Sequence, residues 1–241
     1  PVGSILKYKT LSNNWYQATI YVNGKARTGY IHKSHVENRV DKQQTLQGVA
    51  LNTSTHVYAK ASTKANKLKS YPAGTILKYK TFSNNWYEAT VYIKGKAHKG
   101  FIHKNHVDNT VSSRGKTYYS YGIKHPTHVY ASPSTKAKKL KSYNYGTRLK
   151  YQALSENWYL ATVYISGKAH KGYIAKSDLS NSLPAMEQGY AQSKLTNVYQ
   201  SSSKNSKVLK SYFAGSLLKY RPFNNSWYIA TVYLNGKANI G

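Results

Sequence analysis

The sequence contains no cysteine, only seven acidic residues and only five arginines in a chain of 241 residues. Without cysteine, disulfides, thiol nucleophiles and thiolate metal sites are excluded. No stretch approaches the ~18 consecutive apolar residues of a membrane-spanning helix. These shortages leave lysine, tyrosine and short alternating segments as the features that carry information.

The charge is strongly one-sided. Lysine and arginine total 36, which gives a formal net charge of +29. Lysine is a mobile point charge, whereas arginine is a rigid fork suited to bidentate recognition. A surface dominated by lysine therefore indicates a repetitive polyanion that is bound through charge density. The alternative, that the charge serves solubility alone, is less favoured because so large an unopposed charge also destabilises the compact state.

One stretch, residues 84–96, recurs along the chain as residues 13–25, 156–168 and 225–237. Its tryptophans are Trp15, Trp86, Trp158 and Trp227, at intervals of 71, 72 and 69 residues. Repetition at a fixed period outranks single motifs in deciding the fold. The sequence therefore predicts four copies joined by short polar linkers, called copies one to four here: residues 1–38, 46–109, 118–181 and 187–241.

Copies one and four are incomplete. Copy one begins at the counterpart of Pro72, and copy four stops at Gly241, where a closing Gly-Tyr-Ile strand would begin. We therefore expect the sequence to be a window on a longer protein.

Each complete copy reads as an all-β module of five or six short strands, because β-branched and aromatic residues dominate and no helical period persists. Lys94 and Gly95 form a predicted tight hairpin turn. Successive strand residues point to opposite sides. The side predicted to be core holds Tyr87, Ala89, Val91 and Ile93, and the side predicted to face solvent holds Trp86, Glu88, Thr90 and Tyr92.

Three short motifs repeat in the same order. In copy one they are Asn14-Trp15-Tyr16, Asn23-Gly24-Lys25 and Gly29-Tyr30-Ile31. In this combination the chain resembles the bacterial SH3-like repeats of secreted Gram-positive surface proteins and peptidoglycan hydrolases. The resemblance implies tandem small SH3-like β-barrel modules, located at the cell wall or cell surface, that hold a protein on the wall.

A subgroup of those repeats, the GW modules, closes with Gly-Trp and binds lipoteichoic acid or, in some adhesins, host glycosaminoglycans. Here the closing pair is Gly-Tyr or Gly-Phe. The resemblance therefore implies the role of a binding module and leaves its ligand open.

Catalysis and metal binding are not expected within this sequence. The seven acids scatter among the copies, and only Glu37 and Asp108 fall at equivalent places. No copy holds a pair of carboxylates suited to act across a substrate. His103 and His106 share a spacing with His32 and His35, but copy three has Ala175 and Asp178 instead. We expect no cofactor, and histidines in an exposed loop that gain charge below about pH 6.5.

Lysines interleaved with aromatic residues are the stronger signal. Residues 46–109 carry ten lysines and two acids, a net charge of +8, and residues 118–181 have the same net charge. Aromatic faces can stack on sugars or bases while ammonium groups meet phosphates or sulfates. The competing interpretation is that the aromatic residues serve β-structure alone. The candidate ligand contacts are Trp15, Tyr21, Lys25, Lys78, Trp86, Tyr92, Lys96, Lys104, Lys150, Trp158, Tyr164, Lys168, Lys176, Trp227, Tyr233 and Lys237.

These observations favour a non-catalytic region that attaches a secreted protein to anionic wall polymer, such as lipoteichoic or wall teichoic acid, or to peptidoglycan. Two alternatives remain. The same surface suits sulfated glycosaminoglycans of a host, and lysine and tyrosine beside β-strands also suit single-stranded nucleic acid.

Overall fold

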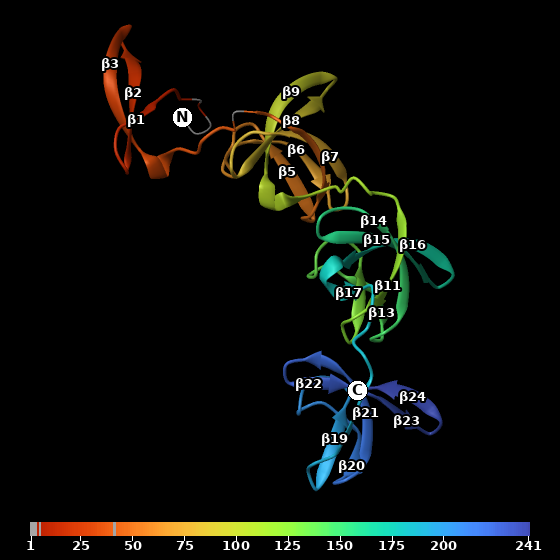
Figure 1. Ribbon diagram of the computed structural model, residues 1–241. Coiled ribbons are helices and arrows are strands. Elements are labelled where there is room, and N and C mark those ends of the chain that lie inside the picture. Colours follow the sequence, from red (N-terminus) through yellow and green to blue (C-terminus); the bar gives the residue numbers. More distant parts are fainter. Residues whose placement is uncertain (1–3, 5, 41) are drawn as a thin grey trace. The chain divides into compact units, whose positions relative to one another are not determined.

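Antiparallel strands joined by tight turns make up the folded parts of the chain. The computed structural model describes residues 4, 6–40 and 42–241 (Figure 1). The described residues form several curled antiparallel sheets, and the only helical turns among them are three short 3₁₀ turns. This confirms the prediction of an all-β chain built of small barrel-like modules. No helix in the described part of the chain is long and apolar enough to span a bilayer.

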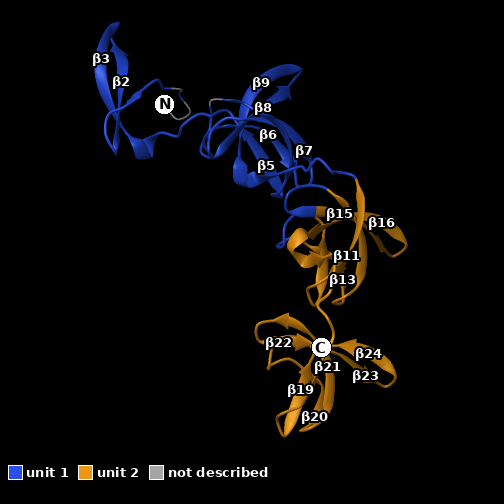
Figure 2. Ribbon diagram, in the orientation of Figure 1, with its two compact units in different colours: residues 1–115, 132–137, 154–158 blue, residues 116–131, 138–153, 159–241 orange. Residues whose placement is uncertain are grey.

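The chain divides into two compact units (Figure 2). The first comprises residues 1–115, 132–137 and 154–158, and the second comprises residues 116–131, 138–153 and 159–241. Copies one and two lie in the first unit, whereas copy three contributes to both. Neither compact unit coincides with a single copy. The copies are therefore defined by the repeat in the sequence, and their boundaries remain predictions.

Among its described residues, the first unit holds two complete sheets. Copy one forms a three-stranded sheet in the order β1-β2-β3. Its elements are β1 (Lys9–Thr10), β2 (Trp15–Val22), β3 (Lys25–His32) and the 3₁₀ turn η1 (Lys33–His35).

Copy two forms a seven-stranded sheet in the order β10-β4-β7-β8-β9-β5-β6. The expectation of five or six strands falls short because the chain returns after η2 and adds a three-residue strand beside β4. The elements are β4 (Thr45–Ala50), β5 (Ser54–Tyr58), β6 (Lys67–Pro72), β7 (Ile76–Thr81), β8 (Trp86–Ile93), β9 (Lys96–His103), η2 (Lys104–His106) and β10 (Val107–Asn109).

Copy three repeats this arrangement in the order β13-β12-β16-β15-β14-β11-β17. Its elements are β11 (Thr117–Gly122), β12 (Thr127–Tyr130), β13 (Lys139–Tyr143), β14 (Arg148–Ala153), β15 (Trp158–Ile165), β16 (Lys168–Ala175), η3 (Lys176–Asp178) and β17 (Leu179–Ser180).

Copy four forms three smaller sheets, β18-β21-β22, β19-β20 and β23-β24. Their strands are β18 (Glu187–Tyr190), β19 (Leu195–Tyr199), β20 (Val208–Phe213), β21 (Leu217–Asn224), β22 (Trp227–Ile229), β23 (Thr231–Leu234) and β24 (Lys237–Ile240).

The core of copy two lies on the side of β8 that alternation predicts. Tyr87, Ala89 and Val91 are buried, and Ile93 packs against the same cluster. The other members of the cluster are Ala50, Val57, Leu77, Tyr79, Ile102 and Val107. In copy three the corresponding cluster is Val129, Leu149, Tyr151, Ala161, Val163 and Ile174. The predicted core side is therefore correct.

The hairpin turn also follows from the sequence. Lys94 and Gly95 have φ angles of 48° and 79°, and Ile93 pairs directly with Lys96 across the two-residue loop. Positive φ at both loop positions gives the type I′ turn, whose twist matches that of the strands. The counterparts Asn23-Gly24, Ser166-Gly167 and Asn235-Gly236 have the same positive φ angles.

The two acids at equivalent places have structural partners in the first unit. The Asp108 carboxylate is buried and accepts hydrogen bonds from the Asn157 backbone N–H at 2.8 Å and from its side-chain amide at 2.9 Å. The Glu37 carboxylate accepts a hydrogen bond from the backbone N–H of Asn85. Each acid thus holds the loop that precedes the next tryptophan strand. At the later counterparts of Asp108 and Asn157 the chain has Ser180 and Ser226.

Candidate functional site

Among the predicted aromatic contacts, the outward tyrosine near each hairpin turn is the most exposed. Tyr92, Tyr164 and Tyr233 are each 65% exposed, and Tyr21 is 75% exposed. Each lies two residues before the turn, beyond the part of the hairpin that other strands cover. The prediction that Tyr92 faces solvent is confirmed, and a ring this open is available to stack on a flat ligand.

The lysine after the turn does not share the tyrosine's side. Tyr92 pairs with Ala97, whereas Lys96 pairs with Ile93. Directly paired residues project to the same side of an antiparallel pair and adjacent residues to opposite sides. Tyr92 and Lys96 therefore leave the hairpin in opposite directions. The same pairing separates Tyr21 from Lys25 and Tyr233 from Lys237, while the exposed Lys168 occupies the corresponding position in copy three.

A lysine in each 3₁₀ turn lies over a tyrosine ring. The distance from Nζ to the ring centroid is 5.2 Å for Lys104 and Tyr87, and 5.1 Å for Lys176 and Tyr159. Lys33 and Tyr16 form the same contact at 5.1 Å in copy one. Burial, and then the neighbouring Tyr151, raises the pKa of the Tyr159 phenol, so the ring is neutral and attracts the ammonium through its π face.

A second set of lysine–tyrosine pairs was missed from the sequence. Lys69 lies 5.5 Å from the centroid of Tyr71, and its Nζ also donates to the backbone carbonyl of Tyr92 at 3.4 Å. The counterparts are Lys141 over Tyr143 at 5.5 Å and Lys210 over Tyr212 at 5.2 Å. The signal was present as a repeated Lys-Ser-Tyr, since residues two apart on a strand share one side.

Two predicted lysines project outward from the strand after the Pro-Ala-Gly or Tyr-Gly turn. Lys78 of β7 and Lys150 of β14 are exposed, while the residues on either side of each are buried. Lys150 pairs with Tyr119, which is 50% exposed. Lys78 pairs instead with Gln47. Lys78 and Lys150 therefore have different neighbours although they are equivalent in sequence. Tyr119 was not among the contacts predicted from the sequence.

The tryptophans of the complete copies are not solvent-facing, which corrects the prediction from alternation. Trp86 is 6% exposed and lies in a second cluster with Tyr58, Phe82 and Phe101. The rings of Tyr58 and Trp86 meet edge to face at 6.0 Å, an arrangement aromatic pairs favour. Trp158 is 8% exposed. One side of β8 is thus covered at its start and open near its turn.

The remaining two tryptophans are less buried than Trp86 and Trp158. Trp15 is 44% exposed, and copy one contains no counterpart of Tyr58 that could cover it. Trp227 is half-buried, with its ring 6.0 Å from that of Tyr199. Because the counterpart Trp86 is covered by Tyr58 and its cluster in copy two, the exposure of Trp15 does not by itself indicate a ligand site.

The histidines support the 3₁₀ turns. His103 accepts a hydrogen bond from the Asn105 N–H through Nδ1 at 3.3 Å, and its ring meets Trp86 edge to face at 5.0 Å. His106 is half-buried rather than exposed as expected, and burial followed by His103 and His56 lowers its pKa. No group of three His, Asp or Glu side chains with metal-binding geometry occurs among the residues that the structure describes.

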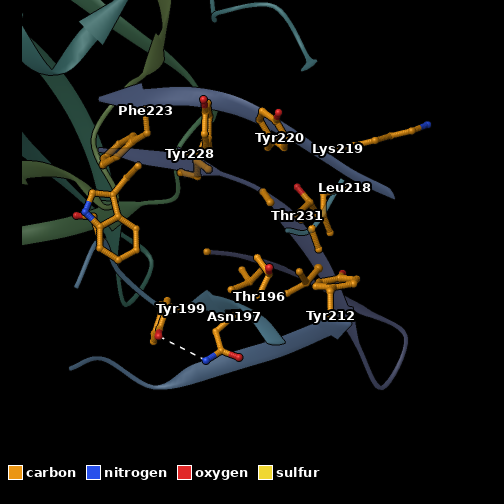
Figure 3. Close-up of a pocket in the computed structure, with 18 of the residues that line it drawn as sticks. Thr196, Asn197, Tyr199, Tyr212, Leu218, Lys219, Tyr220, Phe223, Tyr228 and Thr231 are labelled. Carbon is orange, nitrogen blue, oxygen red and sulfur yellow. Dashed lines mark hydrogen bonds between the residues drawn. The ribbon is translucent and has the colours of Figure 1, made fainter. Parts of the chain in front are cut away.

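A cavity of about 630 Å³ lies in copy four (Figure 3). Figure 3 shows Tyr220 and Tyr228 on one side, Tyr199 and Tyr212 on the other, and Lys219 extending away. Tyr220 and Tyr228 correspond to the core residues Tyr79 and Tyr87. In copy two that core includes Ile102, whose counterpart position would follow Gly241. The cavity is thus the open core of copy four, not a site repeated in every copy.

Most of the lysines are electrostatically unopposed. Within the described residues, the one ion pair is Lys99 with Glu88, at 2.7 Å. Asp108 and Glu37 are occupied by Asn157 and Asn85. In each copy the surface therefore carries ammonium groups without an acidic partner and exposed tyrosine rings. The ammonium groups can bind anions, and the rings can stack on flat groups.

Comparison with known proteins assigns no family. No protein-family model matches the sequence, and no curated protein matches it. Two solved structures with some likeness are NlpC1 and NlpC2 from Trichomonas vaginalis, each at 11% identity, with TM-scores of 0.23 and 0.22. Each alignment covers 59% of this chain, and 48% and 50% of those chains respectively. A likeness this low says nothing about function.

Proposed function

We propose that this chain is a non-catalytic repeat region that attaches a secreted Gram-positive protein to an anionic polymer of the cell wall. Teichoic acid, with its phosphate backbone, is the polymer class that fits best. The observation that carries the proposal is the lysine held over a tyrosine at the same place in three copies: Lys33 on Tyr16, Lys104 on Tyr87 and Lys176 on Tyr159.

Repetition of a weak site suits a repetitive ligand. A cation–π contact at an exposed position contributes only about 0.5–1 kcal/mol, so an ammonium group over a ring is positioned but keeps N–H donors free for a phosphate. Linked weak sites gain affinity because the second contact is intramolecular, by roughly 10²–10⁴-fold. A polymer with evenly spaced phosphates can engage several copies at once.

The environment of the acids supports a non-catalytic role. Asp108 accepts two hydrogen bonds from Asn157, and Glu88 is paired with Lys99. A general acid or base needs a geometry in which it can reach a reacting group. These carboxylates are instead held by their neighbours within the fold.

Salt dependence tests the proposal directly. Binding of the full chain to purified cell walls should weaken steeply as salt rises. By analogy with DNA, about six neutralised phosphates would give a loss on the order of 10³-fold between about 50 and 200 mM salt. Walls stripped of teichoic acid should bind less. Equal binding at both salt concentrations, or to stripped and intact walls, would contradict the proposal.

A matched pair of variants separates the site from net charge. One variant carries Lys33→Gln, Lys104→Gln and Lys176→Gln, and the other carries Lys60→Gln, Lys64→Gln and Lys136→Gln in exposed loops. Both lose three charges, so the first should bind teichoic acid more weakly only if the lysines over tyrosine form the site. Competition by heparin but not by teichoic acid would favour host glycosaminoglycans instead.

A further inference from the structure

The outer face of β11 and β14 in copy three gathers cationic and aromatic side chains from two strands. Tyr119 pairs directly with Lys150, and Tyr121 pairs directly with Arg148. Paired residues share a side of the sheet, so these four side chains lie on one face. The alternate residues Leu149 and Tyr151 are buried in the core. This face therefore points away from the core.

Arg148 is positioned by an aromatic ring. Its guanidinium carbon lies 4.9 Å from the centroid of Tyr119. Stacking of this kind orders the planar fork, and an ordered fork loses less freedom when it binds the oxygens of a tetrahedral anion. Tyr119 is still 50% exposed, which leaves ring surface for the apolar side of a sugar or glycerol unit. Lys150 adds a second charge beside it.

The neighbouring strands add no acid to this face. Across β15 the partner of Gln152 is Leu160, and across β17 the partner of Tyr121 is Ser180. In copy two the corresponding partners are Glu88 and Asp108. The positions of Tyr119 and Arg148 are occupied there by Gln47 and Ile76. Asp108 is buried against Asn157, so the copy-two face presents Lys78, Lys80 and one acid, Glu88, without an aromatic residue, whereas the copy-three face joins its cations to Tyr119 and carries no acid.

From this difference we propose that Tyr119, Arg148 and Lys150 form a subsite of copy three for a tetrahedral oxyanion ester, either a phosphodiester or a sulfate ester within a polymer. The subsite rests on the proposed function and makes it more specific. In copy three, the polymer would be recognised by the oriented guanidinium of Arg148 and not by charge density alone. Arg148 binds two anion oxygens, Lys150 binds a third or a neighbouring anion, and Tyr119 orients the fork.

A substitution that preserves charge tests the subsite. Arg148→Lys keeps the net charge but removes the fork, so binding through charge density alone predicts no change. The subsite predicts affinity lower by about threefold to tenfold, because lysine keeps the charge and loses about one hydrogen bond of ordinary strength. Tyr119→Leu should lower affinity similarly, and the double variant should lose less than the product of the two, because ring and guanidinium act together.

The measurement is titration of the full chain with poly(glycerol phosphate) and, separately, with heparin, at about 150 mM salt, where exposed charges are screened beyond about 8 Å. The matched control is Arg27→Lys on β3 of copy one, which makes the same exchange at another exposed strand position. That exchange should change affinity less than twofold. Thermal unfolding of each variant checks that the fold is intact. Because the substituted positions are exposed, the unfolding temperature should not change.

The outcomes separate the two proposals. A loss for Arg148→Lys with poly(glycerol phosphate) supports the subsite with a phosphodiester ligand. A loss with heparin alone supports the subsite with a sulfate ester, and the teichoic acid assignment is then overturned only if the unaltered chain fails to bind poly(glycerol phosphate). If Arg148→Lys and Tyr119→Leu leave the affinity for both polymers unaltered, in a chain that binds poly(glycerol phosphate), the subsite is overturned and the proposed function stands. Failure of the unaltered chain to bind either polymer overturns both.

Discussion

Copies two and three have the same strand neighbours, the same type of hairpin turn and equivalent buried residues, yet their surfaces differ. Copy two carries Gln47, Ile76 and Glu88 where copy three carries Tyr119, Arg148 and Leu160. A repeated core therefore leaves the surface free to diverge. Surface positions change stability little, so each copy can acquire its own binding properties at little cost to folding.

The glycine of the closing strand shows what must stay the same. A Cβ atom at Gly100 would collide with Val57, and one at Gly172 would collide with the corresponding Val129. In both copies the valine is fully buried. An atom added in such close packing would force the neighbouring side chain to shift. Copies two and three therefore both have glycine and valine at these two positions.

The largest expected effect concerns what the two copies share. Trp86→Ala should destabilise copy two by about 3–5 kcal/mol, the usual loss for a buried tryptophan, and Trp158→Ala should do the same in copy three. Tyr92→Ala, on the same side of the same strand, should cost less than about 0.5 kcal/mol because the ring is exposed. Hydrogen exchange of peptides from each copy, measured by mass spectrometry in the full chain, would report the losses separately.

If Trp86→Ala leaves hydrogen exchange in copy two unchanged, the tryptophan is not part of the packed cluster. If Tyr92→Ala also weakens binding to cell walls without changing exchange, the exposed tyrosine is a ligand contact. The two variants thus separate a structural aromatic residue from a binding one that alternation had grouped together.

The next effect concerns a difference between the copies. Asp108→Ala removes a buried acceptor of two hydrogen bonds from Asn157, which should cost about 1.5–3 kcal/mol, as for bonds to charged groups. Ser180→Ala, the counterpart in copy three, should cost less than about 0.5 kcal/mol. Denaturant unfolding of the full chain, with exchange at the Asn157 amide, measures both. Equal losses for the two variants would show that Asp108 has no special role.

The smallest effect is the response to acid. The folded-state pKa of His106 is lowered by burial and then by His103 and His56. Between the reference value of about 6.5 and that lowered pKa, the unfolded chain binds more protons, so stability falls as pH drops. In copy three the counterparts of His103 and His106 are Ala175 and Asp178. Burial and then Lys139 lower the pKa of His128, the counterpart of His56, and Asp178 partly offsets that lowering.

Copy two should therefore lose more protection than copy three when the pH falls from about 7 to 5.5. Hydrogen exchange corrected for its intrinsic pH dependence would measure the difference. His106→Gln should remove most of the extra sensitivity of copy two. Identical pH responses in the two copies would show that this histidine does not titrate with folding.

Much of the fold could be predicted because it depends on local pattern. Alternation along β8 identified Tyr87, Ala89 and Val91 as core, and the Lys94-Gly95 pair identified the turn. The lysine–tyrosine pairs at Lys69 and Tyr71 could also have been found, since the two residues are two apart on a strand. The partners Tyr119 and Arg148 come from strands about thirty residues apart, and their pairing depends on a register that no local pattern sets.

The sequence by itself determined the all-β class, the repeat, the hairpin turns and the large positive charge, because each follows from composition or from the two-residue period of a strand. Only the tertiary structure decided which outward residues are exposed. Trp86 and Tyr92 project from the same side of β8, and Tyr58, Phe82 and Phe101 cover the first but leave the second open. Alternation assigns a residue to a side of the strand, but the residues that cover each part of that side come from distant segments.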